Sequence, residues 1–414
     1  MSDSVCHCVV DTHELHVSAA QSHPKNATIY KYYKYGDTAR DLLACKLVQV
    51  KDRSRTIQLY SIHGHPLDPS QFAVAGRDRF VRVFDRRSCA KPTALYCPHA
   101  LRDHGPYIQH LGTHTVQCGL VCTGRAGRAQ FAVAGRDRFV RVFDRRSCAK
   151  PTALYCPHAL RDHGCSVAAV CPGRAGRAQF AVAGRDRFVR VFDRRSCAKP
   201  TALYCPHALR DHGTGSRAAL QASAMHLTCA VYSHDGREIL GSYNDEDVYL
   251  FDAQADVYDK DNPKEGYTHR YSGHRNSATV KGVSFFGPNS EYIVSGSDCS
   301  FIYIWEKKSE AIVQWMQGDS GGVVNCIETH PRAPVLATSG LDKDVKIWIP
   351  MSGEDPDYSG LEAVVRENSV SILRSPLFND FLPSLYTAWR GDDRGDELPR
   401  YVAQEFHQNV CTAF

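Results

Sequence analysis

The sequence predicts an all-β fold built from repeated sheets, and three observations support this prediction. One block, QFAVAGRDRFVRVFDRRSCAKPTALYCPHALRDHG, occurs letter for letter at residues 71–105, 130–164 and 179–213. After residue 227, short runs rich in Val, Ile, Tyr and Phe are divided by Gly, Asp, Asn and Pro turns. No segment of helical periodicity separates these runs, which excludes alternating strand–helix units. Self-similarity at a period of about 40–50 residues favours a β-propeller among the all-β folds.

Composition and charge restrict the class of protein. The 414 residues are 43% hydrophobic and 23% charged, as in soluble globular proteins. No apolar run approaches the roughly 18 residues that span a bilayer, and the first residues, MSDSVCHCVV, do not resemble a secretory signal. We therefore expect no membrane partner. The 17 cysteines are expected to be free thiols in a reducing compartment.

The first part of the chain leads into the copied block. Residues 1–27 show no regular pattern and are expected to be irregular. β-type runs follow at residues 29–35 (IYKYYKY), 43–50 and 57–62 (IQLYSI). Each copy then holds two runs, FAVAG and FVRVFD, on either side of a polar Arg-Asp-Arg turn. Between the copies, residues 115–122 and 166–171 are each suited to one further short strand.

The second part of the chain has a regular rhythm. Strands are predicted at LTCAVY, EILGSY and VYLFD, then at VKGVSFF, YIVSG, FIYIW and AIVQWM, and finally at GVVNCIE, VLATSG and VKIW. We expect an irregular segment at 1–27, a β-propeller at 28–350 and a partly helical or disordered tail at 351–414. The propeller has about six blades if the copies fold, in a ring that is closed or incomplete.

The spacing of particular residues resembles the WD-repeat β-propeller pattern. Gly273-His274 precedes Trp305 by a typical blade length, and other aromatic residues follow an Asp by six positions. In that family the Asp accepts hydrogen bonds in the turn between the second and third strands. The His and a Ser or Thr of the blade tie this turn to the third-strand aromatic residue. The resemblance assigns these structural roles to Asp78, Asp137, Asp186, Asp245, His274, Trp305, Asp342 and Trp348. One departure is Cys299, which lies six residues before Trp305 with Asp298 adjacent.

A longer resemblance covers roughly residues 43–105 and 179–350. Stretches such as LTCAVYSHDGREILGSYNDEDVYLFD and GGVVNCIETHPRAPVLATSGLDKDVKIW are similar to the cullin-4-associated WD-repeat substrate receptors, in particular member 8 of that group. The resemblance implies a non-enzymatic subunit that holds a protein substrate for a cullin-4 RING ubiquitin ligase. It implies no cofactor, and location in the nucleus and cytoplasm. Residues 106–213 interrupt it, so the copies are either a recent duplication, a gene-model error or real extra blades.

The end of the copied third strand carries the candidate partner contact. Its Asp-x-Arg ending resembles the box by which such propellers dock on the cullin-4 adaptor DDB1, the large subunit of the damaged-DNA-binding protein. A projecting Arg can make bidentate, charge-assisted hydrogen bonds in a partner's pocket. The preceding Asp would hold the strand end or orient the guanidinium. The implied adaptor-binding residues are Asp85, Arg87, Asp144, Arg146, Asp193 and Arg195.

Comparison with other blades helps to distinguish a docking role for these arginines from simple exposure at the edge of the blade. Asp252 is followed by Ala253-Gln254, and Glu306 is followed by Lys307-Lys308, a weaker Lys version. Arg occupies this position only in the copies. From spacing alone, solvent-exposed decoration is the simpler interpretation; the family resemblance favours the docking role.

Three other motifs have plainer explanations. The copied cysteines and histidines, Cys89, Cys97, His99 and His104, lack the spacing of a zinc knuckle, so no metal site is expected. The Arg-rich blade edge loosely resembles a nucleic-acid surface. However, each copy holds seven Lys/Arg and three Asp, so triplication alone exceeds the net charge of +5 and nucleic-acid binding is not expected. The GDSGG letters around Ser320 lack a matching His and Asp, and no catalytic residue is expected.

Two other functions remain open at this level. The chain could be a WD-repeat scaffold for another assembly, such as one on chromatin. It could also be the non-functional product of a rearranged gene, in which case an open ring would expose strand edges and be poorly soluble.

Overall fold

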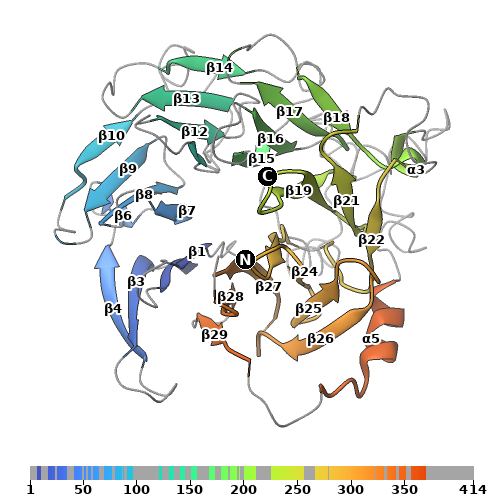
Figure 1. Ribbon diagram of the computed structural model, residues 1–414. Coiled ribbons are helices and arrows are strands. Elements are labelled where there is room, and N and C mark those ends of the chain that lie inside the picture. The colour runs from blue at the N-terminus through green and yellow to red at the C-terminus, as the bar shows by residue number, and fades with distance from the viewer. Residues whose placement is uncertain are drawn as a thin grey trace, which may run out of the picture.

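The strands of the protein form antiparallel sheets arranged around a ring, as expected for a β-propeller (Figure 1). The structure is a computed structural model. It describes residues 7–10, 17–23, 26–34, 42–48, 51–52, 55–56, 59–64, 70–76, 80–85, 87, 91–96, 121–123, 130–134, 140–144, 151–155, 167–172, 179–184, 187–193, 195, 200–210, 225–255, 266–277, 279–320, 322–330, 333–341, 345–350 and 356–369. Within these ranges no helix is long and apolar enough to cross a membrane.

Seven sheets, here numbered blades 1 to 7 in chain order, are formed by the described strands. Blade 1 holds β1 (His7–Val10), β2 (Val17–His23), β3 (Asn26–Lys34) and β4 (Leu42–Val48). A two-stranded ribbon follows, β5 (Lys51–Asp52) and β6 (Arg55–Thr56). Strands β1 and β2 thus lie within the segment expected to be irregular, and the blades number seven instead of about six.

Blades 2 to 4 are built on the three copies. Blade 2 holds β7 (Leu59–Gly64), β8 (Gln71–Gly76), β9 (Val81–Asp85) and β10 (Ala94–Tyr96). Blade 3 holds β11 (Val121–Thr123), β12 (Gln130–Ala134), β13 (Val140–Asp144) and β14 (Ala153–Tyr155). Blade 4 holds β15 (Val167–Pro172), β16 (Gln179–Gly184), β17 (Val189–Asp193) and β18 (Ala202–Tyr204). The copies therefore fold as real blades, each completed by a first strand from outside the copied block.

Blades 5 to 7 come from the regular second part of the chain. Blade 5 holds β19 (Leu227–Tyr232), β20 (Glu238–Tyr243), β21 (Val248–Asp252) and β22 (His269–Tyr271). Blade 6 holds β23 (Val283–Phe286), β24 (Tyr292–Gly296), β25 (Phe301–Glu306) and β26 (Ile312–Gln317). Blade 7 holds β27 (Val324–Thr329), β28 (Leu336–Gly340) and β29 (Lys346–Trp348). Two short helices are α3 (His207–Arg210) and α5 (Leu361–Asn368).

The ring is closed between its first and last sheets. Strand β1 of blade 1 contacts β27 and β28 of blade 7 on one side and β7 of blade 2 on the other. Figure 1 shows the blades following one another around the ring in chain order. Closure covers the faces of the terminal sheets, which an open propeller would leave exposed.

The hydrophobic core consists of layers between consecutive blades. Ala75 and Val83 of blade 2 pack in one cluster with Val133 and Phe143 of blade 3. Equivalent clusters join blades 3 and 4, 4 and 5, 5 and 6, and 6 and 7. Successive residues of these strands point to opposite faces and most are buried, as in β16 and β17, so each blade buries both of its faces. Burying each Val or Phe side chain contributes about 1.5–3 kcal/mol to stability.

Candidate functional site

The first candidate contact lies at the end of β9, where Asp85 and Arg87 form a bidentate ion pair. Arg87 Nε donates to Asp85 Oδ1 at 3.0 Å, and an Arg87 Nη donates to Asp85 Oδ2 at 2.6 Å. The backbone N–H of Arg87 also donates to Asp85 Oδ1, at 2.9 Å. The Arg87 side chain is 75% exposed and that of Asp85 is 18% exposed. The carboxylate therefore holds the turn and supports an outward guanidinium.

The same pair recurs two blades further on. Arg195 Nε donates to Asp193 Oδ1 at 3.0 Å, an Arg195 Nη donates to Asp193 Oδ2 at 2.6 Å, and the Arg195 N–H donates to Asp193 Oδ1 at 2.8 Å. The Arg195 side chain is 79% exposed. Identical sequence in an identical blade setting thus produces the same geometry twice.

These pairs lie on one face of the ring. Asp85, Asp144 and Asp193 each end the third strand of their blade, opposite Gln71, Gln130 and Gln179 respectively. Because the register is the same in three consecutive blades, the three strand ends point to the same face. We call this surface the Asp-x-Arg rim, comprising Asp85, Arg87, Asp144, Asp193 and Arg195. Arg146 lies outside the described residues.

Hydrogen bonding within the pair changes the acidity of its members. The pKa of Asp85 is lowered from 3.8 to about 2, first by the side-chain hydrogen bond from Arg87 and then by the backbone one. The pKa of Arg195 is raised by its hydrogen bond to Asp193. Both groups therefore stay charged at neutral pH.

Comparison with blade 5 separates the roles of the two residues. Asp252 ends β21 and accepts from the backbone N–H of Gln254 at 2.8 Å, as Asp85 does from Arg87. The Asp is therefore a turn-forming residue with or without an arginine two positions later. Among the described residues, the guanidinium is what distinguishes the copied strand ends from this one.

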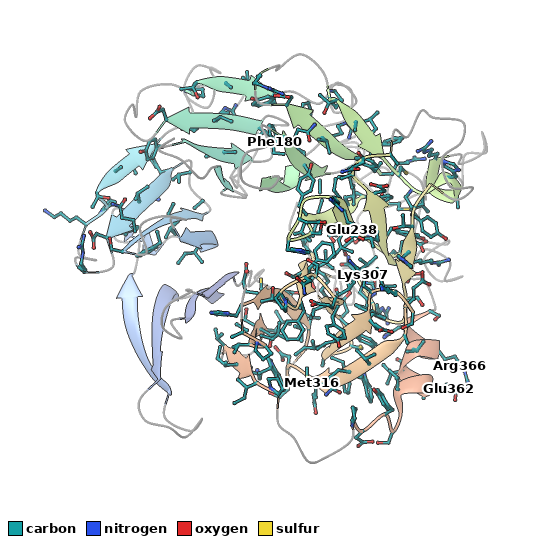
Figure 2. All side chains as sticks on the ribbon, viewed as in Figure 1. Phe180, Glu238, Lys307, Met316, Glu362 and Arg366 are labelled. Carbon is teal, nitrogen blue, oxygen red and sulfur yellow. The ribbon has the colours of Figure 1, made fainter. Side chains whose placement is uncertain are left out.

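Blade 6 uses its basic residues differently. Glu306 ends β25 and accepts from the Ser309 hydroxyl. Lys307 Nζ lies 2.9 Å from Glu238 Oε2, which links blade 6 to blade 5 (Figure 2). Lys308, which occupies the position of Arg87, is exposed. Blade 6 therefore has no carboxylate-held guanidinium among its described residues.

In blades 5 and 6, a tyrosine from the preceding blade supports the end of the third strand. This contact was not identified from the sequence. The Tyr204 ring of β18 lies 5.9 Å from that of Phe251 in β21, and the Tyr204 hydroxyl donates to the Ala253 carbonyl at 3.0 Å. In the next interface, Tyr271 lies 6.1 Å from Trp305 and donates to the Lys307 carbonyl at 2.8 Å.

The copied blades repeat the ring contacts. Tyr96 lies 5.9 Å from Phe143, and Tyr155 lies 5.8 Å from Phe192, in each case across a blade interface. The phenylalanine directly precedes the rim aspartate in both blades. The sequence offers one signal for this contact, which is a Tyr at the same position in each copy. The repeat pattern did not show that it contacts the following blade.

The residues assigned to the WD-repeat pattern form only part of the expected network. Trp348 Nε1 donates to Thr338 Oγ1 at 2.8 Å, a link between third and second strands. Trp305 Nε1 instead donates to the Ser272 carbonyl at 2.9 Å. The buried His274 ring meets Trp305 edge-on at 5.6 Å, and its two nitrogens have no hydrogen-bond partner among the described residues. Burial lowers the pKa of His274 to about 4, so the ring is neutral.

Asp298 takes the place in blade 6 where Cys299 interrupts the spacing. It accepts from the Ser277 N–H at 2.7 Å and the Thr279 hydroxyl at 3.0 Å, and it pairs with the fully buried ammonium of Lys281. The aspartate that stabilises this turn is therefore one residue earlier than the six-residue spacing indicates.

Asp245 of blade 5 has a left-handed backbone conformation, with φ of 57°. Its N–H donates to the Asn276 carbonyl at 2.7 Å. Asn276 Nδ2 in turn donates to the Tyr243 carbonyl at 2.8 Å, so this amide bridges blades 5 and 6. Asp78, Asp137, Asp186 and Asp342 lie outside the described residues.

No cluster suited to a metal ion is found in the part of the chain that the structure describes. That part contains no group of three His, Cys, Asp or Glu side chains suited to hold a metal ion. The copied residues Cys89, Cys97, His99 and His104 lie outside it. Ser320 of the GDSGG stretch is exposed in the loop between β26 and β27.

Comparison with known proteins agrees with the architecture. The family model described as WD domain, G-beta repeat matches residues 266–306 and 311–348. Together with the ring of antiparallel sheets, this match identifies the fold as a WD40-repeat β-propeller.

Particular relatives are similar over shorter stretches. Human WD and tetratricopeptide repeats protein 1 is 38% identical over 151 residues, covering 34% of this chain and 22% of the relative. WD repeat protein iqw1 of Schizosaccharomyces pombe is 39% identical over 117 residues, covering 28% and 14%. Human DDB1- and CUL4-associated factor 6 is 45% identical over 82 residues, covering 20% and 9%. The chain therefore spans less than a quarter of the length of these relatives. Two of these names record WD repeats, the third is that of a DDB1- and CUL4-associated factor, and none of them singles out member 8.

Proposed function

We propose that this chain is a non-enzymatic substrate-recognition subunit of a cullin-4 RING ubiquitin ligase, and that the Asp-x-Arg rim docks it on the adaptor DDB1. The observation that supports this most is the repeated pair of Asp85 with Arg87 and Asp193 with Arg195. Similarity to DDB1- and CUL4-associated factor 6, whose name records an association with both proteins, supports the choice of partner. The closer likeness to member 8, and action in the nucleus and cytoplasm, belong to the same proposal.

The pairing with aspartate suits a docking role. A guanidinium has five N–H donors, and Asp193 accepts from Nε and one Nη of Arg195. Three donors therefore remain for acceptors on a partner. The carboxylate also fixes the orientation of the long side chain, so less conformational entropy is lost on binding. Arginine is one of the residue types that are enriched among binding hot spots.

The proposed role needs no chemistry by the chain itself. A propeller face would hold the substrate while the rim binds the adaptor, and the substrate's effective concentration near the conjugating enzyme would rise.

The direct test is capture of purified DDB1 by the full chain, with both rim arginines and the equivalent Arg146 changed together. We expect Arg87→Gln, Arg146→Gln and Arg195→Gln to weaken binding by tenfold or more, because buried charge-assisted hydrogen bonds at a hot spot are lost. Glutamine is the matched replacement because Gln254 occupies this position in blade 5 beside a correctly folded Asp252 turn. Unchanged capture by a variant that melts like the parent would contradict the proposal.

A control distinguishes docking from general charge. Lys308→Gln removes an exposed positive charge at the corresponding position of blade 6 and should leave capture unchanged. If instead DDB1 never binds and another protein assembly is recovered, the alternative of a WD-repeat scaffold for a different complex is favoured.

A further inference from the structure

Blades 2 to 4 repeat one another in more than their third-strand ends. In each blade, the threonine before the outer strand donates to a third-strand valine carbonyl, through its N–H at 2.7 Å and its hydroxyl at 3.1 Å; these residues are Thr93, Thr152 and Thr201. Exposed positions repeat as well, since Leu95 and Leu154 are both 46% exposed. Identical sequence thus produces the same backbone and the same described outer positions in consecutive blades.

Each rim pair is complete within its own blade. Arg87 is held by Asp85 two residues earlier, and Arg195 is held by Asp193 in the same way. The backbone N–H of each arginine donates to the same carboxylate, at 2.9 and 2.8 Å respectively. The carboxylate that orients each guanidinium therefore belongs to the same strand end as the arginine itself.

The two pairs also have the same relation to the ring. Asp85 lies opposite Gln71 and Asp193 lies opposite Gln179, so both pairs belong to the same face. Seven blades share the full turn about the ring axis, and blades 2 and 4 are therefore separated by about 100°. A rotation of the ring by this angle brings the pair of blade 4 to the place of the pair of blade 2. A partner that fits one pair thus meets the same groups at the other.

We propose that blades 2 and 4 provide two equivalent and independent docking sites for DDB1, so that the propeller docks in either of two orientations related by this rotation. The inference rests on the proposed docking function and adds that each Asp-x-Arg pair suffices by itself. A bound substrate would turn with the ring. It would therefore present a different part of its surface to the conjugating enzyme in each orientation.

Single variants separate two independent sites from one composite site that uses both arginines at once. Capture of purified DDB1 by the full chain is measured in an Arg146→Gln background, so that the two described pairs are compared. Arg87→Gln or Arg195→Gln alone should lower capture by about twofold, because half of the equivalent sites is lost. Both changes together should lower capture by tenfold or more.

The outcomes also separate this proposal from the docking function on which it rests. A tenfold loss from either single change would overturn the equivalence of the two sites and leave docking through the rim standing. No capture by the unchanged chain would contradict the docking function itself, and the two orientations with it.

Photo-crosslinking reads the orientation directly. Benzoylphenylalanine replaces Gln71 or Gln179, opposite the rim aspartates, in the same background. We expect both positions to link to the same DDB1 peptide, because equivalent sites meet the same part of the adaptor. Arg87→Gln should remove the link from position 71 and keep that from 179, and Arg195→Gln should do the reverse. Links to two different DDB1 peptides, or no link while capture persists, would overturn the proposal.

Discussion

The Tyr204 hydroxyl of blade 4 donates to the Ala253 carbonyl of blade 5 at 3.0 Å, directly after the strand end at Asp252. The contact joins the outermost strand of one blade to the third strand of the next. Tyr271 makes the equivalent bond to Lys307. Blade 5 is thus joined to blade 4, and blade 6 to blade 5, beside the turns that correspond to the rim turns of blades 2 to 4.

Removing this hydroxyl should cost measurable stability. We expect Tyr204→Phe to lower the free energy of unfolding by about 1 kcal/mol, the usual net value of a hydrogen bond. Tyr204→Ala should cost about 3–5 kcal/mol, because it also empties space against Phe251. Urea unfolding followed by tryptophan fluorescence measures both. Leu154→Ala, at a 46% exposed position, is the control and should change stability by less than about 0.5 kcal/mol.

The acidity of Asp85 should report the rim pair in solution. The folded pKa of about 2 lies below the ordinary 3.8. The stabilisation is therefore fully present above pH 3.8 and is lost as the pH falls through about 2. Carboxyl NMR titration should show this depressed pKa, and Arg87→Gln should return it towards 3.8. An unaltered pKa in the variant would show that the pair does not persist in solution.

Glu328 should make the protein less stable in alkaline solution. Burial raises its pKa from 4.5 to about 8. Burial favours the neutral carboxyl group in the folded state. The contribution of Glu328 to the free energy of unfolding is therefore fully present below pH 4.5 and is lost as the pH rises through about 8. We expect Glu328→Gln to unfold at higher denaturant concentration than the parent at pH 8. The two proteins should converge near pH 4. A parallel pH dependence would contradict this assignment.

The buried pair of Lys281 and Asp298 should be costly to break from one side. The Lys281 side chain has no exposed surface and that of Asp298 is 5% exposed. Lys281→Met leaves the carboxylate without its counter-charge, and we expect a loss of about 3–5 kcal/mol. The double variant with Asp298→Asn should recover part of this loss, because the remaining amide is uncharged. Denaturant midpoints of the parent and both variants measure the effect. A double variant no better than Lys281→Met alone would argue against an electrostatic cause.

Much of the fold could be predicted because strand patterns are local. The short, nearly continuous apolar runs in QFAVAG and VRVFD are typical of strands with two buried faces. The three copies pair in the same register in all three blades. The strands at residues 7–10 and 17–23 are not predicted by the sequence, because these short runs mix apolar with small and polar residues and show no β-type pattern. The turn aspartate of blade 6 was placed uncertainly for a related reason. A spacing rule identifies a position, whereas the hydrogen bonds of Asp298 depend on Thr279 and Lys281 from the preceding loop.

The sequence predicts which residues form the candidate site but not how their side chains are arranged. The Asp-x-Arg endings are visible in the letters, and so is their absence from blade 5. Their bidentate geometry and the tyrosine from the preceding blade are not visible there.

By itself, the sequence determined the all-β class, the repeated unit and the strand ends that carry arginine. These follow from short-range patterns of apolar residues and turns. Only the tertiary structure decided that the copies are three consecutive blades, that β1 closes the ring against β27, and that each outer tyrosine supports the next blade. The physical reason is that these contacts join residues far apart in the chain, and their energy arises only when neighbouring sheets pack face to face.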